Sequence, residues 1–537
     1  MPTIPNHRDL PARDLTIYLL QEAVTEDQVV AKLAGCAEHR IAVGRTTGRL
    51  FSQAVRNNAG PKWAALFEDQ VDRGALGLVA SVSAVFLIRT SGRLFALTFG
   101  AGRFLLDDDW CEERFGFYAV LNLVDANQIR SVDKKSLDAI GRQTRVQTTR
   151  GATVRDFGVD YERDLLRAVV GTPREEDLGT RVVGATALHA SVRIDLANLQ
   201  RLLAKYYDQS RSHSYRRKFP GIDQLRPVTD ENQISRLDGR VIQALNDRDI
   251  DAFSLAVPDI IDWQQVSVFR YEGLRDATDH YELNIRDLIR LAADAGHQWS
   301  AGDLNRIRIG ILDADGNARE RWALRKCLFG QLRCQGKQWV LSSGLWYSVA
   351  EDLVAEVDEA FNAIERLDGL PHFEHGTEAE YCRHLSMRDG VWALMDRRPI
   401  TFGGGRSSVE FCDLFSRGSS TLLHVKRYAG SGPLSHLFQQ ALVSGETFRT
   451  VPEFRRLVNE KLPHQHQLAD WQPTPQGFRV ALGIVRAGDL TLPFFSKVTL
   501  RNTVRLLRGF DFSVVLAHID VGDARARAAV ARRRRGH

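Results

Sequence analysis

In the first part of the chain, apolar residues alternate with polar ones or run together in short stretches, as in β-strands. Residues 85–90 (VFLIRT) and 93–99 (RLFALTF), separated by two turn residues, predict a β-hairpin. A helical segment begins earlier, with Thr25 as its N-cap and Gln28 at the capping-box position. We therefore predict an α+β domain over residues 1–150.

The pattern changes twice before the last third of the chain. Apolar residues recur at helical spacing in residues 193–207, and residues 151–300 as a whole are expected to be mostly helical. Strand-like spacing returns between residues 306 and 349, and an acidic helix is expected over residues 348–367. We therefore predict a β-rich segment with an acidic helix over residues 301–370.

Residues 371–520 carry a more specific order of elements. The residue patterns predict α-β-β-β-α followed by β-α-β, which is a mixed α/β domain. The predicted elements are a helix over 377–385, strands over 399–402, 409–415 and 421–428, a helix from 434 to about 449, a strand over 478–485, a helix over 497–507 and a buried strand over 512–519.

The second and third predicted strands of this domain bring polar side chains together. On the second strand, alternation places Asp413 on one face and Glu410 and Cys412 on the other. On the third strand, His424 and Lys426 share a face. A tight hairpin between the two strands would bring Asp413 close to Lys426.

An aspartate beside a lysine, with an imidazole near them, suits metal-dependent hydrolysis of a phosphodiester. We expect Asp413 to hold Mg²⁺ or Mn²⁺, with His424 and the backbone carbonyl of Val425 as further ligands. Lys426 would orient the attacking water and stabilise the charge on the pentavalent phosphate.

Over residues 377–519 the sequence resembles the PD-(D/E)XK, or restriction-endonuclease-like, superfamily. That superfamily has an Asp on the second strand, a (D/E)-X-K on the third, a Gln on the following helix and often a Glu on the preceding helix. The corresponding residues here are Asp413, His424 and Lys426, one of Gln439 and Gln440, and one of Glu378 and Glu380. The resemblance implies a restriction-endonuclease-like core that cleaves DNA with Mg²⁺ or Mn²⁺.

Three choices remain within this resemblance. We favour Gln440 because helical spacing pairs it with His436, and we favour Glu380 as the carboxylate of the first helix. His424 departs from the pattern, since it stands where the superfamily has Asp or Glu. An acid from elsewhere in the chain could compensate, or the site could have lost activity.

The chain also resembles, over nearly its full length, a sporadically distributed bacterial family known as domain of unknown function 6119. This resemblance rests on residues 93–106 (RLFALTFGAGRFLL), 409–413 (VEFCD), 424–438 (HVKRYAGSGPLSHLF) and 494–502 (FFSKVTLRN). Members of that family tend to lie on mobile elements near restriction-modification genes. The resemblance implies a role in antiviral (antiphage) defence or DNA restriction.

Composition narrows the class of protein. The chain has 537 residues, 44% of them hydrophobic and 26% charged, which is typical of a multidomain globular protein. Its six cysteines form no CxxC pair, which argues against a zinc ribbon or a secreted disulfide scaffold. The sequence contains neither a signal-peptide pattern nor a long apolar run, so we predict a cytoplasmic protein without a membrane anchor.

Charge is unevenly distributed. Residues 371–537 contain 24 Lys and Arg against 15 Asp and Glu, whereas the first 370 contain 48 against 52. Six of the arginines lie in a basic tail over residues 521–537. A basic C-terminal third favours a nucleic-acid partner through release of counterions. The residues expected to contact nucleic acid are Arg427, Ser435, His436, Lys497 and Arg501.

The sequence thus predicts a metal-dependent nuclease that hydrolyses DNA in bacterial antiphage defence. DNA is the expected partner, RNA stays open, and a defence-system partner protein or a homo-oligomer would fit the first 370 residues. The alternative is a catalytically inactive nucleic-acid-binding or scaffold protein in which His424 marks a lost acid. A nucleotide-sensing body ranks last, because the chain has no P-loop or dinucleotide fingerprint.

Overall fold

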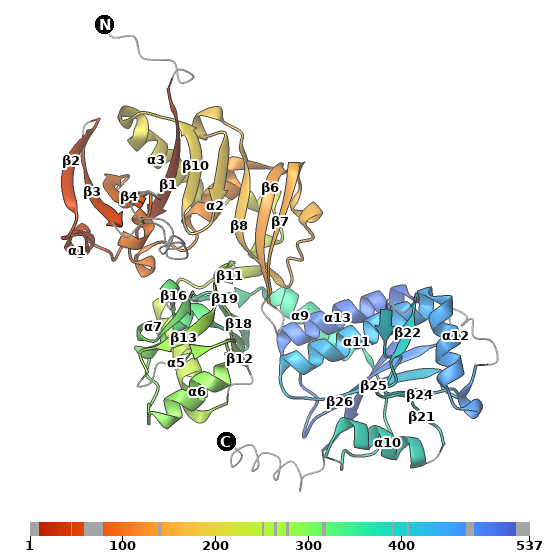
Figure 1. Ribbon diagram of the computed structural model, residues 1–537. Coiled ribbons are helices and arrows are strands. Elements are labelled where there is room, and N and C mark those ends of the chain that lie inside the picture. Colours follow the sequence, from red (N-terminus) through yellow and green to blue (C-terminus); the bar gives the residue numbers. More distant parts are fainter. Residues whose placement is uncertain are drawn as a thin grey trace, which may run out of the picture. The chain divides into compact units, whose positions relative to one another are not determined.

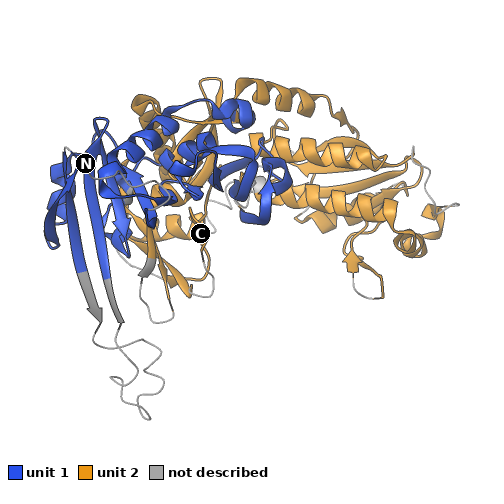
Figure 2. Ribbon diagram, turned by 90° about the horizontal axis from the view of Figure 1, so that it is seen from above, with its two compact units in different colours: residues 1–135, 143–223 blue, residues 136–142, 224–537 orange. Residues whose placement is uncertain are grey.

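The computed structural model of the chain is drawn in Figure 1. It describes residues 10–44, 46–57, 79–137, 142–249, 252–261, 266–274, 279–313, 318–374, 376–388, 390–404, 407–468 and 477–521. Most of the expected basic tail, residues 522–537, lies outside the described residues. The chain forms two compact units, coloured separately in Figure 2: residues 1–135 with 143–223, and residues 136–142 with 224–537.

The first unit is built on a ten-stranded sheet in the order β2-β3-β4-β5-β1-β10-β9-β8-β6-β7. Its strands are β1 (Ala12–Leu19), β2 (Ala37–Val43), β3 (Thr46–Asn57), β4 (Val79–Thr90), β5 (Arg93–Phe99), β6 (Val124–Ser136), β7 (Gln143–Ala152), β8 (Asp164–Pro173), β9 (Arg181–Gly184) and β10 (Leu188–Arg193). Its helices are α1 (Glu26–Lys32), α2 (Phe115–Leu123), α3 (Leu196–Arg211) and α4 (Tyr215–Lys218). Apolar residues of α2, α3 and the sheet form its main core.

Local signals in this unit are confirmed. Strands β4 and β5 pair as the expected antiparallel hairpin. Helix α1 begins after Thr25, whose side chain accepts from the backbone N–H of Gln28, and the Gln28 side chain accepts from Thr25 in return. A capping box satisfies two N–H groups that the helix itself leaves without partners.

Residues 151–193 contain more strand than expected, because β8, β9 and β10 all fall there. Strand β10 pairs with β1, and Arg193 lies opposite Ala12 in that register. Because this pairing joins segments far apart in the sequence, no short stretch of sequence indicates it. The prediction for residues 151–300 therefore followed the helical spacing of residues 193–207.

The second unit begins with two antiparallel sheets, β11-β19-β18-β17-β12 and β14-β13-β15-β16, which share one apolar core with α5 and α6. This confirms a β-rich region between residues 306 and 349. The strands are β11 (Leu225–Pro227), β12 (Phe253–Leu255), β13 (Val268–Glu272), β14 (Asp279–His280), β15 (Arg308–Leu312), β16 (Ala318–Ala323), β17 (Leu328–Cys334), β18 (Lys337–Ser342) and β19 (Leu345–Val349). The helices are α5 (Glu231–Asp247), α6 (Ile285–Asp294), α7 (Asp303–Arg306), α8 (Leu324–Cys327) and α9 (Glu351–Asn362).

The rest of this unit surrounds a six-stranded sheet in the order β20-β27-β26-β25-β24-β21. Its strands are β20 (Glu365–Arg366), β21 (Ala393–Leu394), β24 (Leu414–Ser416), β25 (Thr421–Arg427), β26 (Arg479–Val485) and β27 (Ser513–Ile519). A separate two-stranded sheet joins β22 (Ile400–Phe402) to β23 (Ser407–Val409). The helices are α10 (Glu378–Arg388), α11 (Ser431–Thr450), α12 (Pro452–Lys461) and α13 (Phe494–Gly509).

Helices cover both faces of the six-stranded sheet (Figure 1). One face packs against α10, and the other packs against α11, α12 and α13. Strands β25, β26, β27 and β20 are parallel, whereas β24 and β21 run antiparallel to their neighbours. A mixed α/β architecture is therefore observed, as the sequence predicted.

One predicted strand of this region is wrong. Residues 409–415 do not form a continuous strand, because β23 ends at Val409 and β24 begins only at Leu414. The break removes the strict alternation on which the expected faces of Glu410 and Asp413 depended.

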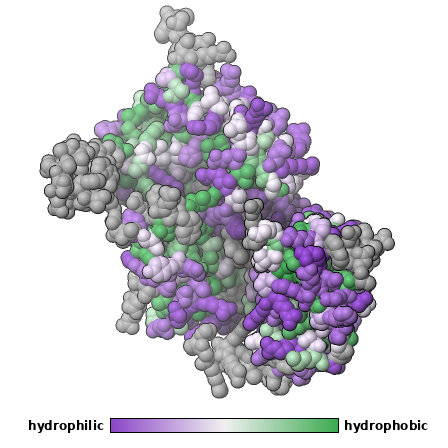
Figure 3. Space-filling model, turned by 45° about the vertical axis from the view of Figure 1, so that its right-hand side comes forward, coloured by the Kyte–Doolittle hydropathy of each residue, from purple (hydrophilic) through white to green (hydrophobic). Residues whose placement is uncertain are grey.

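The distribution of apolar residues can be followed on the surface and along the described helices. On the face seen in Figure 3, hydrophobic side chains are interspersed with hydrophilic ones. Exposed large apolar residues include Phe104 and Met387. Among the described residues, every helix is too short or too polar to span a lipid bilayer.

Candidate functional site

A cavity of about 400 Å³ lies where β25 ends beside α10 and α11. Four acidic residues, three basic residues and one glutamine are among its lining residues. They are Glu378, Asp396, Glu410 and Asp413, then Arg397, Lys426 and Arg427, and finally Gln440. The cavity thus brings Asp413 and Lys426 to one space, as the predicted hairpin required.

The backbone of Asp413 is fixed on two sides. Its N–H donates to the carbonyl of Leu423 on β25 at 3.1 Å. Its carbonyl accepts from the N–H groups of Met395 at 2.9 Å and Asp396 at 3.0 Å. These bonds hold Asp413 next to β25 and bring Asp396 to the same cavity.

Phe411 anchors the irregular segment that precedes β24. Its fully buried ring lies 4.8 Å from the ring of Phe448, and its carbonyl accepts a hydrogen bond from the hydroxyl of Ser444. With Phe411 in the core, both Glu410 and Asp413 line the cavity. The expectation that Glu410 and Asp413 face opposite sides is therefore wrong, because these residues do not lie in a regular strand.

Asp413 is the most perturbed acid of the cavity. Protein atoms surround its carboxyl group closely, and this desolvation is the main cause that raises its pKa to about 7. Asp396 and Glu410 raise the pKa further through repulsion. The hydrogen bond from the N–H of Val425, at 2.6 Å, and the charge of Lys426 oppose the rise without cancelling it.

Lys426 is held by a carboxylate from the first helix. Its Nζ lies 3.0 Å from one carboxylate oxygen of Glu378, and the other oxygen accepts from the N–H of Arg427 at 2.8 Å. Both side chains of the ion pair are about 30% exposed, at 28% for Lys426 and 30% for Glu378. The lysine is therefore positioned by protein and still reachable from the cavity.

Glu380, the favoured carboxylate of this helix, lies elsewhere. Its carboxylate accepts from the N–H of Thr377 at 3.0 Å, and its own N–H donates to the Thr377 hydroxyl at 3.2 Å. This is a capping box at the start of α10. Glu380 is not among the cavity residues, and Glu378 is the helix carboxylate that lines the cavity.

His424 is buried rather than exposed to the cavity. Its side chain is 3% exposed, and burial lowers its pKa to about 4, so the imidazole is neutral at physiological pH. Within the described part of the chain, its Nε2 has no hydrogen-bond partner. The structure places His424 outside the set of residues that line the cavity.

Gln440 of α11 reaches the cavity. Its amide nitrogen lies 3.5 Å from a carboxylate oxygen of Glu410, which is the outer limit of a hydrogen bond. Gln440 therefore lines the same cavity as Asp413, whereas His436, with which helical spacing paired it, does not line that cavity.

The five residues expected to contact nucleic acid are not gathered at one site. Arg427 lines the cavity, whereas Ser435 lines a different pocket of the same unit. His436 is exposed, and Arg501 is half-buried on α13. Lys497 binds Asp358 of α9 at 2.7 Å, so its charge is already matched.

The donor set of the cavity suits a hard divalent cation, although the side chains do not converge into a complete metal site. Among the described residues, no three His, Cys, Asp or Glu side chains form a ready coordination cluster. Mg²⁺ does not need one, because it keeps several waters and is commonly bound by one or two carboxylates together with substrate phosphates. Asp413 would hold the ion with the carbonyl of Val425, and Glu410 or Asp396 would complete the charge.

No sequence pattern indicated Asp396 or the position of Glu410 on the cavity wall. Asp396 follows the two-residue strand β21, which is too short to leave a periodic pattern. Glu410 was placed on the wrong face by alternation. The signal for Glu378 was present, because Thr377 and Glu380 have capping-box spacing and so leave Glu378 as the uncommitted acid.

Comparisons with known proteins identify one family. The family described as "Family of unknown function (DUF6119)" matches residues 15–520. No curated protein and no solved structure matches the chain. Since the match covers nearly all of the sequence, the chain belongs to the DUF6119 family.

Proposed function

We propose that this protein is a metal-dependent nuclease whose active site is the cavity around Asp413 and Lys426, and that it hydrolyses phosphodiester bonds of DNA in antiphage defence. The observation that carries the proposal is the shared cavity: an acid with a strongly raised pKa and a positioned lysine face the same space of about 400 Å³. Perturbed acids that face a cleft beside a cation are typical of catalytic sites.

The order of elements supports the proposal as well. The helix α10 with its carboxylate, the antiparallel strands β24 and β25, and the helix α11 with Gln440 follow one another as in PD-(D/E)XK nucleases. Asp413 directly precedes β24, and Lys426 lies on β25. His424 departs from that pattern. Asp396 and Glu410, which line the cavity, supply negative charge that His424 does not.

The residues of this chain would divide the work as follows. Asp413, with either Glu410 or Asp396, would bind the cation, which when bound lowers the pKa of a water and offsets phosphate charge. Glu378 positions the Lys426 ammonium, which orients the attacking water and stabilises negative charge that develops on the phosphate oxygens. Arg397 and Arg427 on the cavity wall offer contacts to neighbouring phosphates.

The test is cleavage of defined DNA. Purified protein is incubated with plasmid, linear duplex and single-stranded DNA, with Mg²⁺, with Mn²⁺, or with EDTA. We expect cleavage only with metal and its loss in Asp413→Asn. A matched control is Asp511→Asn, since Asp511 lies just after the C-cap of α13 with a positive φ of 64° that asparagine also tolerates. Equal cleavage by the Asp413 and Asp511 variants would overturn the proposal.

Binding without cleavage is the second candidate function. It is favoured by His424, a buried neutral residue at the position where the superfamily has an acid. In the same experiment, this candidate predicts a shifted DNA band with no product under any metal condition. It also predicts that Asp413→Asn binds DNA more tightly than the wild type, because a negative charge near the phosphates has been removed.

A further inference from the structure

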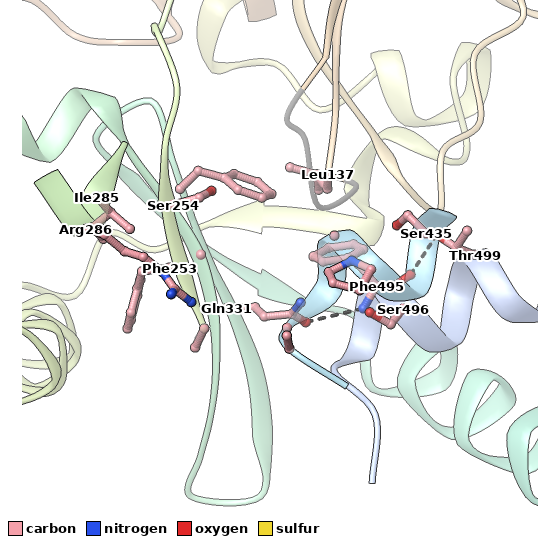
Figure 4. A pocket seen from close by; sticks show the side chains of 17 residues that line it. Leu137, Phe253, Ser254, Ile285, Arg286, Gln331, Ser435, Phe495, Ser496 and Thr499 are labelled. Atoms are coloured by element: carbon pink, nitrogen blue, oxygen red, sulfur yellow. Dashed lines mark hydrogen bonds between the residues drawn. The ribbon is translucent and has the colours of Figure 1, made fainter. Parts of the chain in front are cut away.

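A second pocket in the same unit lies where helices α11 and α13 begin. Its volume is about 220 Å³, and it is lined by the first residues of both helices together with residues of β12, β17 and α6. Figure 4 shows Arg286 of α6 on one wall and Ser435 and Ser496 on the opposite wall. The pocket shares no lining residue with the carboxylate cavity.

Two helix N-termini contribute to this pocket. Helices α11 and α13 have 20 and 16 residues, and the N-cap residue of neither makes a side-chain capping bond. The first N–H groups of a helix have no partner inside the helix and carry partial positive charge. In α13 the N–H of Phe495 donates to Gln331 Oε1 at 3.3 Å. In α11 the first two residues are Ser431 and Gly432, whose N–H groups stand at positions that the helix itself leaves without partners.

An independent observation indicates that a ligand belongs here. Ser496 is 3% exposed and lines the pocket, and its hydroxyl has no hydrogen-bond partner among the described residues. A buried hydroxyl left without a partner costs free energy, so its persistence needs an explanation. The neighbouring Thr499 shows the contrast, since its hydroxyl donates to the carbonyl of Phe495 at 3.0 Å.

The charge and size of the pocket define the class of ligand. Its lining includes Arg286 and no Asp or Glu, so the side-chain charge around it is positive. Helix N-termini combined with an arginine and hydroxyl donors are suited to an oxyanion. A volume of about 220 Å³ is below the roughly 300–1,000 Å³ of sites for drug-sized ligands, so it fits a phosphate group better than a whole nucleotide.

We propose that this pocket is a phosphate-binding site, in which Arg286, Ser435, Ser496 and the first N–H groups of α11 hold one phosphoryl oxyanion. The phosphate could belong to a nucleic acid or to a small ion, and the oxyanion chemistry is the same in both cases. The proposal does not depend on the nuclease proposal, because it rests on different residues and needs no metal or cleavage.

The first test uses the full chain and inorganic phosphate. Thermal unfolding and calorimetric titration with phosphate are compared with chloride at the same ionic strength, in EDTA. We expect saturable stabilisation of the wild type by phosphate. Arg286→Gln and Ser496→Ala should each weaken phosphate affinity by about tenfold, which is the loss of one charge-assisted or hydroxyl contact. Ser496→Ala should not lower stability without phosphate, since its hydroxyl has no hydrogen-bond partner among the described residues.

Arg290→Gln is the matched control for Arg286, because Arg290 is exposed one turn later on α6 and pairs with Asp287 at 2.9 Å. Its phosphate affinity should equal that of the wild type. The absence of saturable phosphate binding, or equal affinity in the Arg286, Ser496 and Arg290 variants, would overturn the proposal.

A second variant separates binding from folding. A side chain added at Gly432 would meet no atom within 4 Å, and an acid in the first turn of a helix is favourable. Gly432→Asp should therefore fold as well as the wild type and yet lose phosphate binding, because its carboxylate takes the place of the anion. A Gly432→Asp protein that binds phosphate at wild-type affinity would contradict the assignment.

The source of the phosphate is decided by competition. A short single-stranded DNA is tested with and without a 5′-phosphate for displacement of inorganic phosphate from the wild type. Displacement by both DNAs assigns the site to backbone phosphates, and displacement only by the phosphorylated DNA assigns it to a terminal phosphate. Phosphate binding that neither DNA disturbs assigns the site to a small ion. Gly432→Asp must abolish whichever binding is seen.

Discussion

The protein shifts the pKa values of two acidic residues of the second unit, Asp303 and Asp413, in opposite directions. Burial alone would raise the pKa of Asp303, but hydrogen bonds from Arg306 and Ser300 and the nearby His297 outweigh it and lower the pKa to about 2. For Asp413, burial and two neighbouring acids outweigh one backbone N–H and a lysine, and its pKa rises to about 7.

The difference separates a carboxylate whose charge stabilises the fold from one whose charge destabilises it. Asp303 accepts from both the N–H and the hydroxyl of Ser300 at 2.8 Å, so its carboxylate completes a local structure. Asp413 faces a cavity that contains further acids, and the N–H of Val425 and the charge of Lys426 compensate its charged form only in part. The divalent cation that we propose would supply the missing positive charge to such a carboxylate.

The largest expected effect comes from replacing the basic side chains beside these acids, Lys426 near Asp413 and Arg306 near Asp303. Lys426→Met should lower the rate of DNA cleavage by on the order of 10²–10³-fold, the loss typical of removing one group that stabilises transition-state charge. Arg306→Met should lower stability and leave the rate per folded molecule unchanged. Plasmid cleavage normalised to the folded fraction measures both. Lys461→Met is the control, since Lys461 is exposed on α12, and a similar loss in this control would break the comparison.

Asp303→Asn should destabilise the second unit by about 1–3 kcal/mol at pH 7, because a buried hydrogen-bonded charge is lost while Arg306 remains partly solvated. The folded-state pKa is depressed, so this contribution is present above about pH 3.8 and is lost as pH falls toward 2. Urea unfolding of wild type and variant should differ by a constant amount from pH 7 to about pH 4, and the difference should shrink below. A difference that grew on acidification would contradict this assignment.

Asp413→Asn should have the opposite effect in metal-free protein and raise the free energy of unfolding by about 1–2 kcal/mol at pH 8. The folded-state pKa is raised, so the wild type loses stability as pH rises from about 3.8 through 7, whereas the asparagine variant does not. Thermal unfolding in EDTA between pH 5 and pH 9 checks this. Addition of Mg²⁺ should reverse the order, because the ion binds only the folded wild type. A variant less stable than the wild type at pH 8 in EDTA would show that Asp413 is structural.

The smallest expected effects are those of replacing Glu378 and Glu380, the two acids of α10, and they should differ between the two residues. Glu380→Gln should change stability by less than about 0.5 kcal/mol and leave cleavage intact, because glutamine also serves in a capping box. Glu378→Gln weakens the hold on Lys426 and should lower the cleavage rate by about tenfold. Parallel assays of the two variants provide the measurement, and equal rates would remove Glu378 from the site.

Much of the C-terminal fold could be predicted because its elements carry strong local signals. Buried strands such as β25 and β27 and the long helix α11 were expected close to their observed bounds. Helix α12 and the short strand β21 were not expected, since the first follows α11 almost without a break and the second has only two residues. Pairing of β10 with β1 was beyond reach for a different reason, because it depends on contacts distant in sequence.

The site was predictable only where residues follow a regular element. Lys426 is on β25 and Gln440 on α11, so periodicity was a sound guide for both. Glu410 lies in an irregular segment whose direction is set by the burial of Phe411, a tertiary effect that alternation cannot represent. Asp396 lies at the cavity because its backbone N–H donates to the carbonyl of Asp413, a contact that exists only in the folded chain.

The most direct test of the account is a calorimetric titration of Mn²⁺ into metal-free wild type, Asp413→Asn and Asp511→Asn at pH 8. The account predicts one binding event in the wild type and in Asp511→Asn, and an affinity more than about tenfold weaker in Asp413→Asn. Equal Mn²⁺ affinity in all three proteins would contradict the central claim that the carboxylate of Asp413 binds a divalent cation.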